Sequence, residues 1–465
     1  MPIILLYKNA LRKQKMNSSS TPSVSFYTLG CKLNYTETEA ISRQMQSQGF
    51  TEVAFGENPA DVYIINTCSV TDQADKKCRY VLRQVRRMAP EAKVIVVGCY
   101  AQLKPAEIAA IPGVDLVLGA SEKFNIPQHL SNLYEKSSNK GTYIACDIDN
   151  VADFKTAYAS STRTRAFLKV QDGCDYSCSF CTIPLARGNS RSDTIENIVS
   201  TAYEIAESGV REIVLTGVNI GDYGKGLAEE NKASFLHLIQ ALDKVTDIAR
   251  FRISSIEPNL LSEDIIDFVA ASERFVPHFH IPLQAGDNRI LGLMRRRYRR
   301  ELYAERVAAI KAKMPDACIG VDIMVGFPTE TETEFLNSYH FLNELPVSYF
   351  HVFTYSERSN TLAATLRPAV AQNERNRRSK MLRILSDKKK RFFYTQNIGK
   401  MQQVLWEAER QEGNFLHGFT QNYVKVKTPY DASLINTLQT ITVDGVDAEG
   451  IAFISALQPT DVALL

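Results

Sequence analysis

Short apolar runs and longer amphipathic stretches alternate along the chain from residue 23 onward. In the first part of the chain the apolar runs predict strands at residues 24–29, 61–66, 93–97 and 115–119. Between them, apolar residues recur at helical spacing over residues 36–48 and 73–88. Strands that alternate with helices form parallel sheets, so this part is predicted to be an α/β domain built on a parallel sheet.

Six further apolar runs continue the alternation, at residues 165–171, 212–216, 251–254, 278–283, 319–325 and 349–355. Helical patterns fill the gaps at residues 195–208, 235–245, 263–271, 302–313 and 332–342. Six strand–helix units predict a partial, TIM-like (β/α)6 barrel. Such barrels carry their active residues at the carboxyl ends of the strands, so we expect functional residues directly after each strand.

After residue 399 the pattern changes to short strands with alternating apolar positions, which is typical of a small β-barrel. The chain therefore divides into a polar extension expected to be disordered, the α/β domain, a polar linker, the partial barrel and the small β-barrel. Their expected limits are residues 1–22, 23–146, 147–164, 165–398 and 399–465. A length of 465 residues agrees with several domains, since it is too great for one hydrophobic core.

The composition narrows the kinds of protein that this chain can be. Its net charge of +2 excludes a polycation, so contact with nucleic acid has to come from local basic patches. Nine cysteines, an odd number at wide spacings, disfavour a disulfide scaffold and favour metal-binding cysteines in a reducing compartment. No apolar run reaches the ~18 residues of a membrane span. We therefore expect a cytoplasmic protein with no membrane partner.

Three cysteines, Cys174, Cys178 and Cys181, fall in one short loop directly after the first strand of the partial barrel. Three thiolates can bind three irons of a 4Fe–4S cluster and leave the fourth iron open to a further ligand. A zinc site is disfavoured because zinc requires four N or S ligands and this loop offers three. The loop is therefore predicted to hold an iron–sulfur cluster with one open iron.

A second set, Cys31, Cys68 and Cys99, places one cysteine after each of the first three strands of the α/β domain. The carboxyl ends of parallel strands meet at one edge of a sheet, so these thiols are expected to converge. On the pattern alone, three packing cysteines that never meet stay open as an alternative. The cysteines expected to pack in the interior are Cys78, Cys146 and Cys318.

Both sets lie in motifs that resemble known families. The spacing of the first set, with Phe180 before its last cysteine, resembles the radical S-adenosylmethionine (SAM) superfamily. The segments around the second set closely resemble the N-terminal domain of the methylthiotransferases, and this resemblance covers nearly the whole chain after residue 23. They are Gly30-Cys31-Lys32-Leu33-Asn34, Asn66-Thr67-Cys68-Ser69-Val70 and Gly98-Cys99-Tyr100-Ala101-Gln102. Residues 418–423 resemble the RNA-binding TRAM domain.

The resemblance implies two 4Fe–4S clusters, a radical cluster on the first set of cysteines and an auxiliary cluster on the second. It also implies two molecules of SAM per turnover, one that methylates sulfur and one that gives the radical. Residues of the cluster loop and of the strand ends would bind SAM, namely Phe180, Thr216, Gly217, Glu257, Gln284, Asp322 and Gly326. The family usually has Gly where this chain has Thr329.

The resemblance is closest to the tRNA methylthiotransferase branch that acts on N6-threonylcarbamoyladenosine at position 37, beside the anticodon. The reaction adds a methylthio group to carbon 2 of the adenine, an unactivated C–H position that acid–base chemistry cannot reach. The implied partners are the anticodon stem-loop of tRNA and a small electron donor of the flavodoxin or ferredoxin type. Three alternatives stay open: methylthiolation of N6-isopentenyladenosine in tRNA, methylthiolation of a ribosomal-protein aspartate, and a non-catalytic iron–sulfur protein that binds RNA.

The threonylcarbamoyl group carries a carboxylate, and a buried carboxylate requires a cationic partner. Arg187 and Arg191 follow the cluster loop and Arg358 follows the sixth barrel strand, so these three are the expected partners. Two basic runs, at residues 295–300 and 388–391, are expected either to contact phosphate or to form a solvated face.

Overall fold

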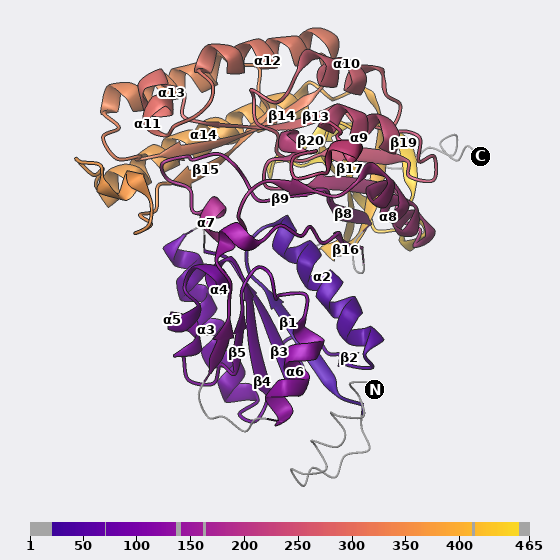
Figure 1. Ribbon diagram of the computed structural model, residues 1–465. Helices are drawn as coiled ribbons and strands as arrows, with labels where there is room; N and C mark the ends of the chain where they lie inside the picture. The colour runs from indigo at the N-terminus through magenta and orange to yellow at the C-terminus, as the bar shows by residue number, and fades with distance from the viewer. Residues whose placement is uncertain (1–20, 70, 136–140, 161–163, 412–413, 455–465) are drawn as a thin grey trace.

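The computed structural model describes residues 21–454 except 70, 136–140, 161–163 and 412–413. Nearly all of the extension expected at residues 1–22, and the chain after residue 454, lie outside the described residues. Figure 1 shows the N-terminal unit below the barrel, with the C-terminal strands packed behind the barrel. Among the described residues, none of the helices has the length and apolar character needed to cross a membrane.

A six-stranded sheet organises the N-terminal unit, in the order β2-β1-β3-β4-β5-β6, and every neighbouring pair in it is parallel. The predicted parallel α/β domain is therefore confirmed. The strands are β1 (Ser23–Thr28), β2 (Thr51–Glu52), β3 (Val62–Thr67), β4 (Lys93–Gly98), β5 (Leu116–Leu118) and β6 (Thr142–Ile144).

Helices cover both faces of this sheet because apolar side chains of its strands point alternately to either side. In β3, Val62 and Ile64 pack with α2 and α6, whereas Tyr63 and Ile65 pack with α3. The helices are α2 (Lys32–Ser47), α3 (Asp72–Met88), α4 (Cys99–Leu103), α5 (Pro105–Ala109) and α6 (Ile126–Glu135). The helix α2 starts four residues earlier than predicted, at Lys32, since Cys31 has the extended conformation of an N-cap residue.

The central unit is a partial barrel of six parallel strands, as predicted. Its strands form two sheets, β12-β11-β8-β7 and β13-β14-β15, which isolated bridges join at Phe251–Phe275 and Ser255–His280. The parallel strands are β8 (Arg165–Lys169), β11 (Glu212–Thr216), β12 (Arg250–Ile253), β13 (His278–Gln284), β14 (Cys318–Val325) and β15 (Tyr349–Thr354). The expected linker at residues 147–164 contains β7 (Ala157–Ala159), an antiparallel edge strand of the barrel on which α2 packs.

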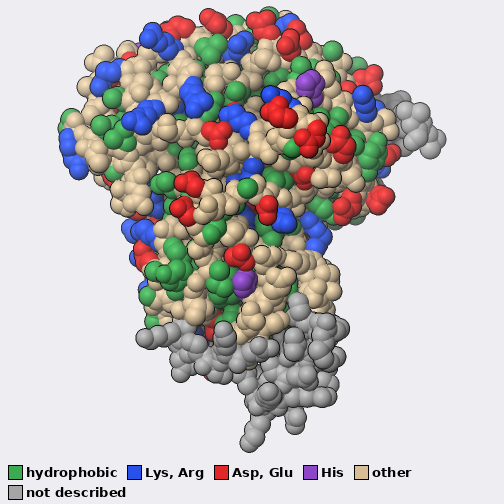
Figure 2. Space-filling model, in the orientation of Figure 1, with side chains coloured by type: hydrophobic (Ala, Val, Ile, Leu, Met, Phe, Trp, Pro, Cys, Tyr) green, Lys and Arg blue, Asp and Glu red, His purple; other side chains and the backbone are tan. Residues whose placement is uncertain are grey.

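Helices wrap the outside of the barrel. Several begin at residues whose side chains accept a hydrogen bond from the first turn, such as Thr194, Ser262 and Thr331. These helices are α8 (Ile195–Glu207), α9 (Phe235–Leu242), α10 (Glu263–Ala271), α11 (Asn288–Leu293), α12 (Arg300–Lys313), α13 (Glu332–Glu344) and α14 (Gln372–Thr395). The short helix α7 (Ile183–Arg187) lies instead between the barrel and the N-terminal unit, where it contacts α4. Figure 2 shows basic and acidic side chains interspersed on the face it presents, as a net charge near zero predicts.

A curled sheet in the order β19-β16-β17-β18-β21-β20 follows α14, where the sequence predicts a small β-barrel. Its core surrounds the fully buried Trp406. Arg250 and Arg252, at the start of β12, donate hydrogen bonds to the carbonyls of Phe419 and Gln421 and so fix this module against the barrel. The strands are β16 (Met401–Gln411), β17 (Phe415–Thr420), β18 (Lys425–Pro429), β19 (Leu438–Thr442), β20 (Gly445–Val446) and β21 (Ala452–Phe453).

Candidate functional site

The loop with the first set of cysteines lies at the carboxyl edge of the barrel, between β9 (Gln171–Asp172) and α7. Gly173 makes the entry into this loop sterically feasible. Its φ is +70°, and an added Cβ would lie 1.9 Å from the carbonyl oxygen of Asn189. A second connection holds the middle of the loop, where the Ser179 hydroxyl donates to the carbonyl of Leu293 at 2.7 Å.

Hydrogen-bond donors surround the three sulfurs. The backbone N–H of Tyr176 donates to Cys174 Sγ and that of Ile183 to Cys181 Sγ, each at 3.4 Å. The guanidinium of Arg296 lies 3.2 Å from Cys178 Sγ. Such donors stabilise thiolate ligands and set the properties of a bound cluster.

Arg296 belongs to the basic run at residues 295–300, which was expected to contact phosphate or solvent. Instead its side chain is buried and paired with Glu257. The next residue, Arg297, lies over the ring of Tyr176 at 4.0 Å and donates to the carbonyl of Asp175. At least these two arginines therefore contact the cysteine loop. The sequence did not predict this contact. In the other run, Lys389 donates to the carbonyl of Leu345.

The donor set fits an iron–sulfur cluster. Burial raises the pKa of the Cys174 thiol to about 11 and that of Cys181 to about 12, so both are neutral until a cation binds. Thiols must lose their protons to bind iron, and the adjacent N–H and guanidinium donors favour that form. Three sulfurs in one loop leave one iron of a 4Fe–4S cube without a cysteine ligand from this set.

Most of the residues expected to bind SAM lie at the carboxyl edge of the barrel or beside the cysteine loop, whereas Asp322 lies within β14. Thr216 and Gly217 line a cavity, and Asp322 lies 2.9 Å from His280, which lines the same cavity. Phe180 packs beside the loop, and Glu257 is held by Arg296. The two others, Gln284 and Gly326, have φ of +64° and +73° at strand ends.

Thr329, where the family usually has Gly, keeps the backbone geometry that glycine favours, with φ of +69°. The remaining cysteines are not grouped at either site. Cys78 and Cys318 are buried in hydrophobic cores as expected, whereas Cys146 is only partly buried.

The second set of cysteines converges at the carboxyl edge of the N-terminal sheet, as the strand ends predict. An added Cβ on Gly30 would lie 2.7 Å from Cys68 Cβ and 3.2 Å from its sulfur. Burial raises the pKa of the Cys99 thiol, and the nearby Cys31 adds to this rise. Three soft sulfur ligands that come together in this way fit a second 4Fe–4S cluster.

Asn34 and Arg187 connect the two sets. Asn34 donates to the carbonyls of Leu29 and Thr67 at 2.9 and 2.8 Å, and so ties together the loops that carry Cys31 and Cys68. Arg187, at the end of α7, donates to Asn34 Oδ1 at 2.7 Å. The cysteine loop and the second set therefore share one hydrogen-bonded framework across the domain boundary.

Arg187 also anchors a buried ion-pair network in which four basic side chains face two carboxylates. Glu37 and Asp172 accept from Arg187 at 3.0 and 2.8 Å. Although burial opposes its charge, Arg187 and its basic neighbours hold the pKa of Glu37 far below its usual range. The other basic members are Lys123, Lys169 and Arg191. The excess positive charge lies beside the second set of cysteines and favours an anionic group there.

The three arginines expected to bind the substrate carboxylate are all engaged by protein carboxylates. Arg187 and Arg191 pair with Asp172 inside the network above. Arg358 pairs with Asp72 at 2.8 Å and with Asp75 at 3.0 Å, and so fastens the last barrel loop to the start of α3. These contacts support a role in holding the domains together and do not support one in binding substrate.

All three domains border a cavity of about 580 Å³. The N-terminal domain contributes Cys31 and Lys32, the barrel contributes Phe167 and Thr216 among others, and the C-terminal module contributes Tyr423. Burial, together with Arg165 and Arg252, lowers the pKa of Lys32 to about 8. A substrate in this cavity would touch Cys31 of the second set together with Thr216 and Gly217 at the carboxyl end of β11.

The chain matches two family models: "Uncharacterized protein family UPF0004" over residues 23–119 and the "Radical SAM superfamily" over residues 168–342. In overall structure it is similar to the radical SAM methyltransferase TsrM from Kitasatospora setae. The TM-score is 0.55 at 12% sequence identity, over 72% of this chain and 73% of that one. This likeness shows the radical SAM fold.

Curated relatives cover most of the chain. It is 40% identical to the threonylcarbamoyladenosine tRNA methylthiotransferase MtaB of Bacillus subtilis, over 87% of this chain and 90% of the relative. The MtaB protein of Aquifex aeolicus is 38% identical, over 87% and 96%. The tRNA-2-methylthio-N(6)-dimethylallyladenosine synthase of Pelotomaculum thermopropionicum is 29% identical, over 90% and 94%. With two cysteine sets, a radical SAM barrel and this identity, the chain belongs to the MtaB family of radical SAM methylthiotransferases, which use 4Fe–4S clusters and SAM.

Proposed function

We propose that this protein adds a methylthio group to carbon 2 of N6-threonylcarbamoyladenosine at position 37 of tRNA. The observation that carries the proposal is the pair of cysteine sets that Asn34 and Arg187 connect. The 40% sequence identity of the chain to an MtaB protein supports it. When bound, the clusters and SAM supply a carbon radical that can break an unactivated C–H bond, together with the sulfur and the methyl group.

The residues of the chain take the following roles. We infer that Cys174, Cys178 and Cys181 hold the radical cluster and that Cys31, Cys68 and Cys99 hold the auxiliary cluster. Thr216 and Gly217 line the cavity at the carboxyl edge of the barrel, and we infer that they contact SAM together with Phe180, Glu257 and Asp322. Gln284 and Gly326 shape the strand ends beside them.

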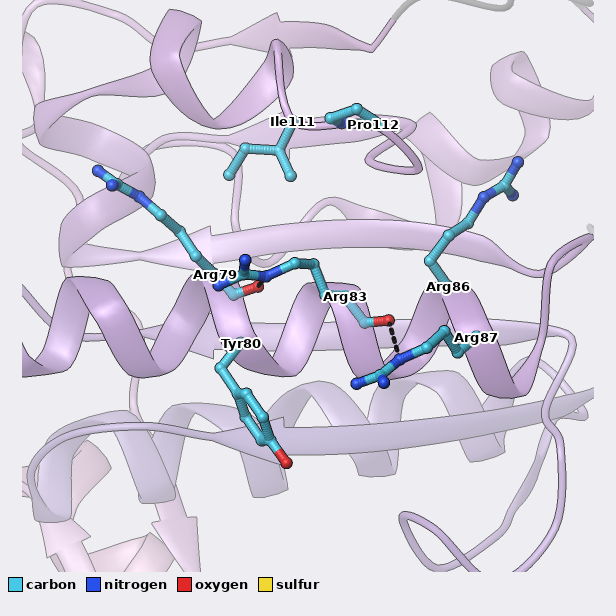
Figure 3. A pocket seen from close by; sticks show the side chains of 7 residues that line it. All are labelled: Arg79, Tyr80, Arg83, Arg86, Arg87, Ile111 and Pro112. Atoms are coloured by element: carbon cyan, nitrogen blue, oxygen red, sulfur yellow. Dashed lines mark hydrogen bonds between the residues drawn. The ribbon is translucent and has the colours of Figure 1, made fainter.

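Two features support tRNA as the partner. The C-terminal module lies against the barrel and contributes Tyr423 to the cavity, so RNA bound there would be next to the reaction site. The second feature is a groove of about 910 Å³ along α3, where Arg79, Tyr80, Arg83, Arg86 and Arg87 project beside Ile111 and Pro112 (Figure 3).

The charge of the α3 groove is largely unpaired. Arg83 and Arg87 donate to backbone carbonyls of α3, and Arg86 to the carbonyl of Pro90. No carboxylate in the described part of the chain forms an ion pair with any of these three. Tyr80 is 57% exposed beside them. Arginines beside an exposed aromatic ring suit the phosphates and bases of RNA. We therefore infer that the anticodon stem-loop contacts α3.

The site also needs an electron for each radical event, and we propose a small flavodoxin- or ferredoxin-type protein as the donor. We place the reaction in the cytoplasm, where tRNA is found and where thiols stay reduced. The isopentenyladenosine branch is the second candidate. The ammonium of Lys32, which lines the cavity, disfavours it because a hydrocarbon substituent offers this charge no partner.

Reconstituted enzyme with SAM and a reductant tests the reaction on three tRNA preparations, bearing threonylcarbamoyladenosine, isopentenyladenosine or plain adenosine. Nucleoside mass spectrometry should show the methylthio product on the first preparation only. Product on the isopentenyl preparation alone would refute the choice of substrate and leave the reaction class standing. Absence of product on all three, with both clusters present, would refute the reaction itself.

A further inference from the structure

Three basic side chains, Lys32, Arg165 and Arg252, line the cavity, and two of them already have anionic partners. Arg252 donates to both carboxylate oxygens of Glu212, at 2.9 and 3.1 Å. Arg165 lies 2.7 Å from a carboxylate oxygen of Glu407. The protein itself therefore neutralises these two charges.

Lys32 differs from both arginines. No carboxylate or carbonyl of the described residues forms a hydrogen bond or ion pair with its ammonium, and Nζ lies 5.6 Å from the ring centroid of Phe167. The side chain is exposed, and it borders the cavity that all three domains line. An ammonium that has no partner and faces a cavity gains from an anionic ligand that can pair with it.

A bound metal ion is the competing interpretation of the cavity. His280, Asp322 and His351 bring one ligand atom each to within 4.8 Å of one another. The carboxylate of Asp322 is already 2.9 Å from His280, and Lys32 and both arginines face the same space. Because Glu407 and Glu212 neutralise the two arginines, it is the unpaired ammonium of Lys32 that repels a cation, so an anion is the better ligand.

We propose that the Lys32 ammonium binds the carboxylate of the threonylcarbamoyl group and thereby selects the modified adenosine. This inference rests on the proposed function and names the residue that reads its substrate. The carboxylate distinguishes this nucleoside from isopentenyladenosine. Beside Lys32 the cavity has apolar walls at Phe167, Val214 and Ile253, which suit a flat base. Since Cys31 precedes Lys32, the bound side chain would lie next to the auxiliary site.

A binding experiment tests the charge directly. Two anticodon stem-loop RNAs would carry threonylcarbamoyladenosine or its methyl ester, which removes the negative charge and keeps the rest of the group. Affinities are measured with cluster-loaded protein in the absence of SAM and reductant. The natural protein should prefer the acid by at least about 30-fold, as expected for a close charge pair at an interface. In Lys32→Gln the preference should fall to about 3-fold or less, within the scatter of such measurements.

Two further variants serve as controls. Lys32→Arg keeps the charge and should retain most of the preference, and Lys232→Gln, at a lysine whose side chain is 74% exposed, should leave it unchanged. An unchanged preference in Lys32→Gln would overturn the inference. The inference would also be wrong if Lys32→Gln and Lys32→Arg lost the preference for the acid equally at unchanged iron content. That result would show that the shape of lysine is needed and that its charge is not sufficient.

SAM also carries a carboxylate, so a separate arm measures SAM affinity and the formation of 5′-deoxyadenosine without RNA. Both should be the same in Lys32→Gln and in the natural protein. A loss of SAM affinity with an intact preference for the acid RNA would assign Lys32 to SAM and overturn the proposal. The binding ratio decides the role of Lys32, whereas product analysis of the natural enzyme decides the proposed function, so the two failures can be told apart.

Discussion

Replacing Gly173 by Ala tests whether the geometry of the cysteine loop determines the radical site. The residue has φ of +70°, where a residue with a side chain costs about 1–2 kcal/mol. The added Cβ would lie 1.9 Å from the carbonyl oxygen of Asn189 and 2.7 Å from that of Gly188. Both obstacles are backbone atoms, so the overlap cannot be relieved by a change of side-chain rotamer.

The overlap sets the size of the effect. Bringing the Cβ to an ordinary contact requires the loop and its neighbour to separate by about 1 Å, and a displacement of that size at an active site costs about 100-fold in rate. Gly209 provides the matched control, since its φ is +83° and an added Cβ meets nothing within 4 Å. Gly209→Ala should therefore carry only the conformational cost of about 1–2 kcal/mol.

The assay combines iron content, 5′-deoxyadenosine formation and thermal unfolding of both variants after anaerobic reconstitution. Gly173→Ala should lose most of its SAM cleavage and up to about four irons, those of one cube, whereas Gly209→Ala should keep both at slightly lower stability. If Gly173→Ala matched Gly209→Ala in iron content and in SAM cleavage, the proposed link between the loop backbone and the radical site would be wrong.

Three further predictions concern the two cysteine sets and the RNA surface. The protein should carry about eight irons, and about four should remain when the first set is replaced by Ala, as measured by iron analysis; an unchanged content would contradict the assignment of Cys174, Cys178 and Cys181. Cys31→Ala should keep the reductive cleavage of SAM and lose the methylthio product, and equal loss of both in folded protein would argue against separate roles. The double change Arg83→Glu and Arg87→Glu should weaken tRNA binding at least about 10-fold at low salt and reduce its salt dependence by about two counterions. Lys232→Glu is the control for the last prediction, and equal affinities in the two proteins would remove α3 from the RNA interface.

The features that local sequence determines were predictable. Each cysteine of the second set follows an apolar run that forms a parallel strand, and parallel strands deliver the residues after them to one edge. The order of strands and helices likewise follows from their periodicity, because burial on both faces of the sheet requires it. The start of α2 was not predicted because Cys31 offers no typical side-chain cap. For the same reason the sequence did not place Lys32 in the first turn of this helix.

The partners of charged residues were not predictable, because docking of the domains brings them together. Arg187 follows the cysteine loop as a substrate-binding arginine could, yet its partner Glu37 lies 150 residues away in the other domain. Arg358 meets Asp72 across 286 residues. In the basic run at residues 295–300, Arg296 faces a sulfur and is not on a solvated face. The sequence shows how many basic side chains a segment has. It does not show which of them are neutralised by carboxylates from another domain.

Neutralisation of the other cations explains how a cavity rich in basic groups can still be selective. Arg165 and Arg252 are held by Glu407 and Glu212, so they shape the cavity without demanding a ligand. Of these three cations, Lys32 alone has no partner among the described residues, so its charge depends on what enters. A base with a carboxylate supplies its partner, whereas a base with a hydrocarbon group displaces water from the ammonium and offers nothing in return. The energetic penalty therefore falls on the wrong substrate, which is a stronger basis for discrimination than an added contact to the right one.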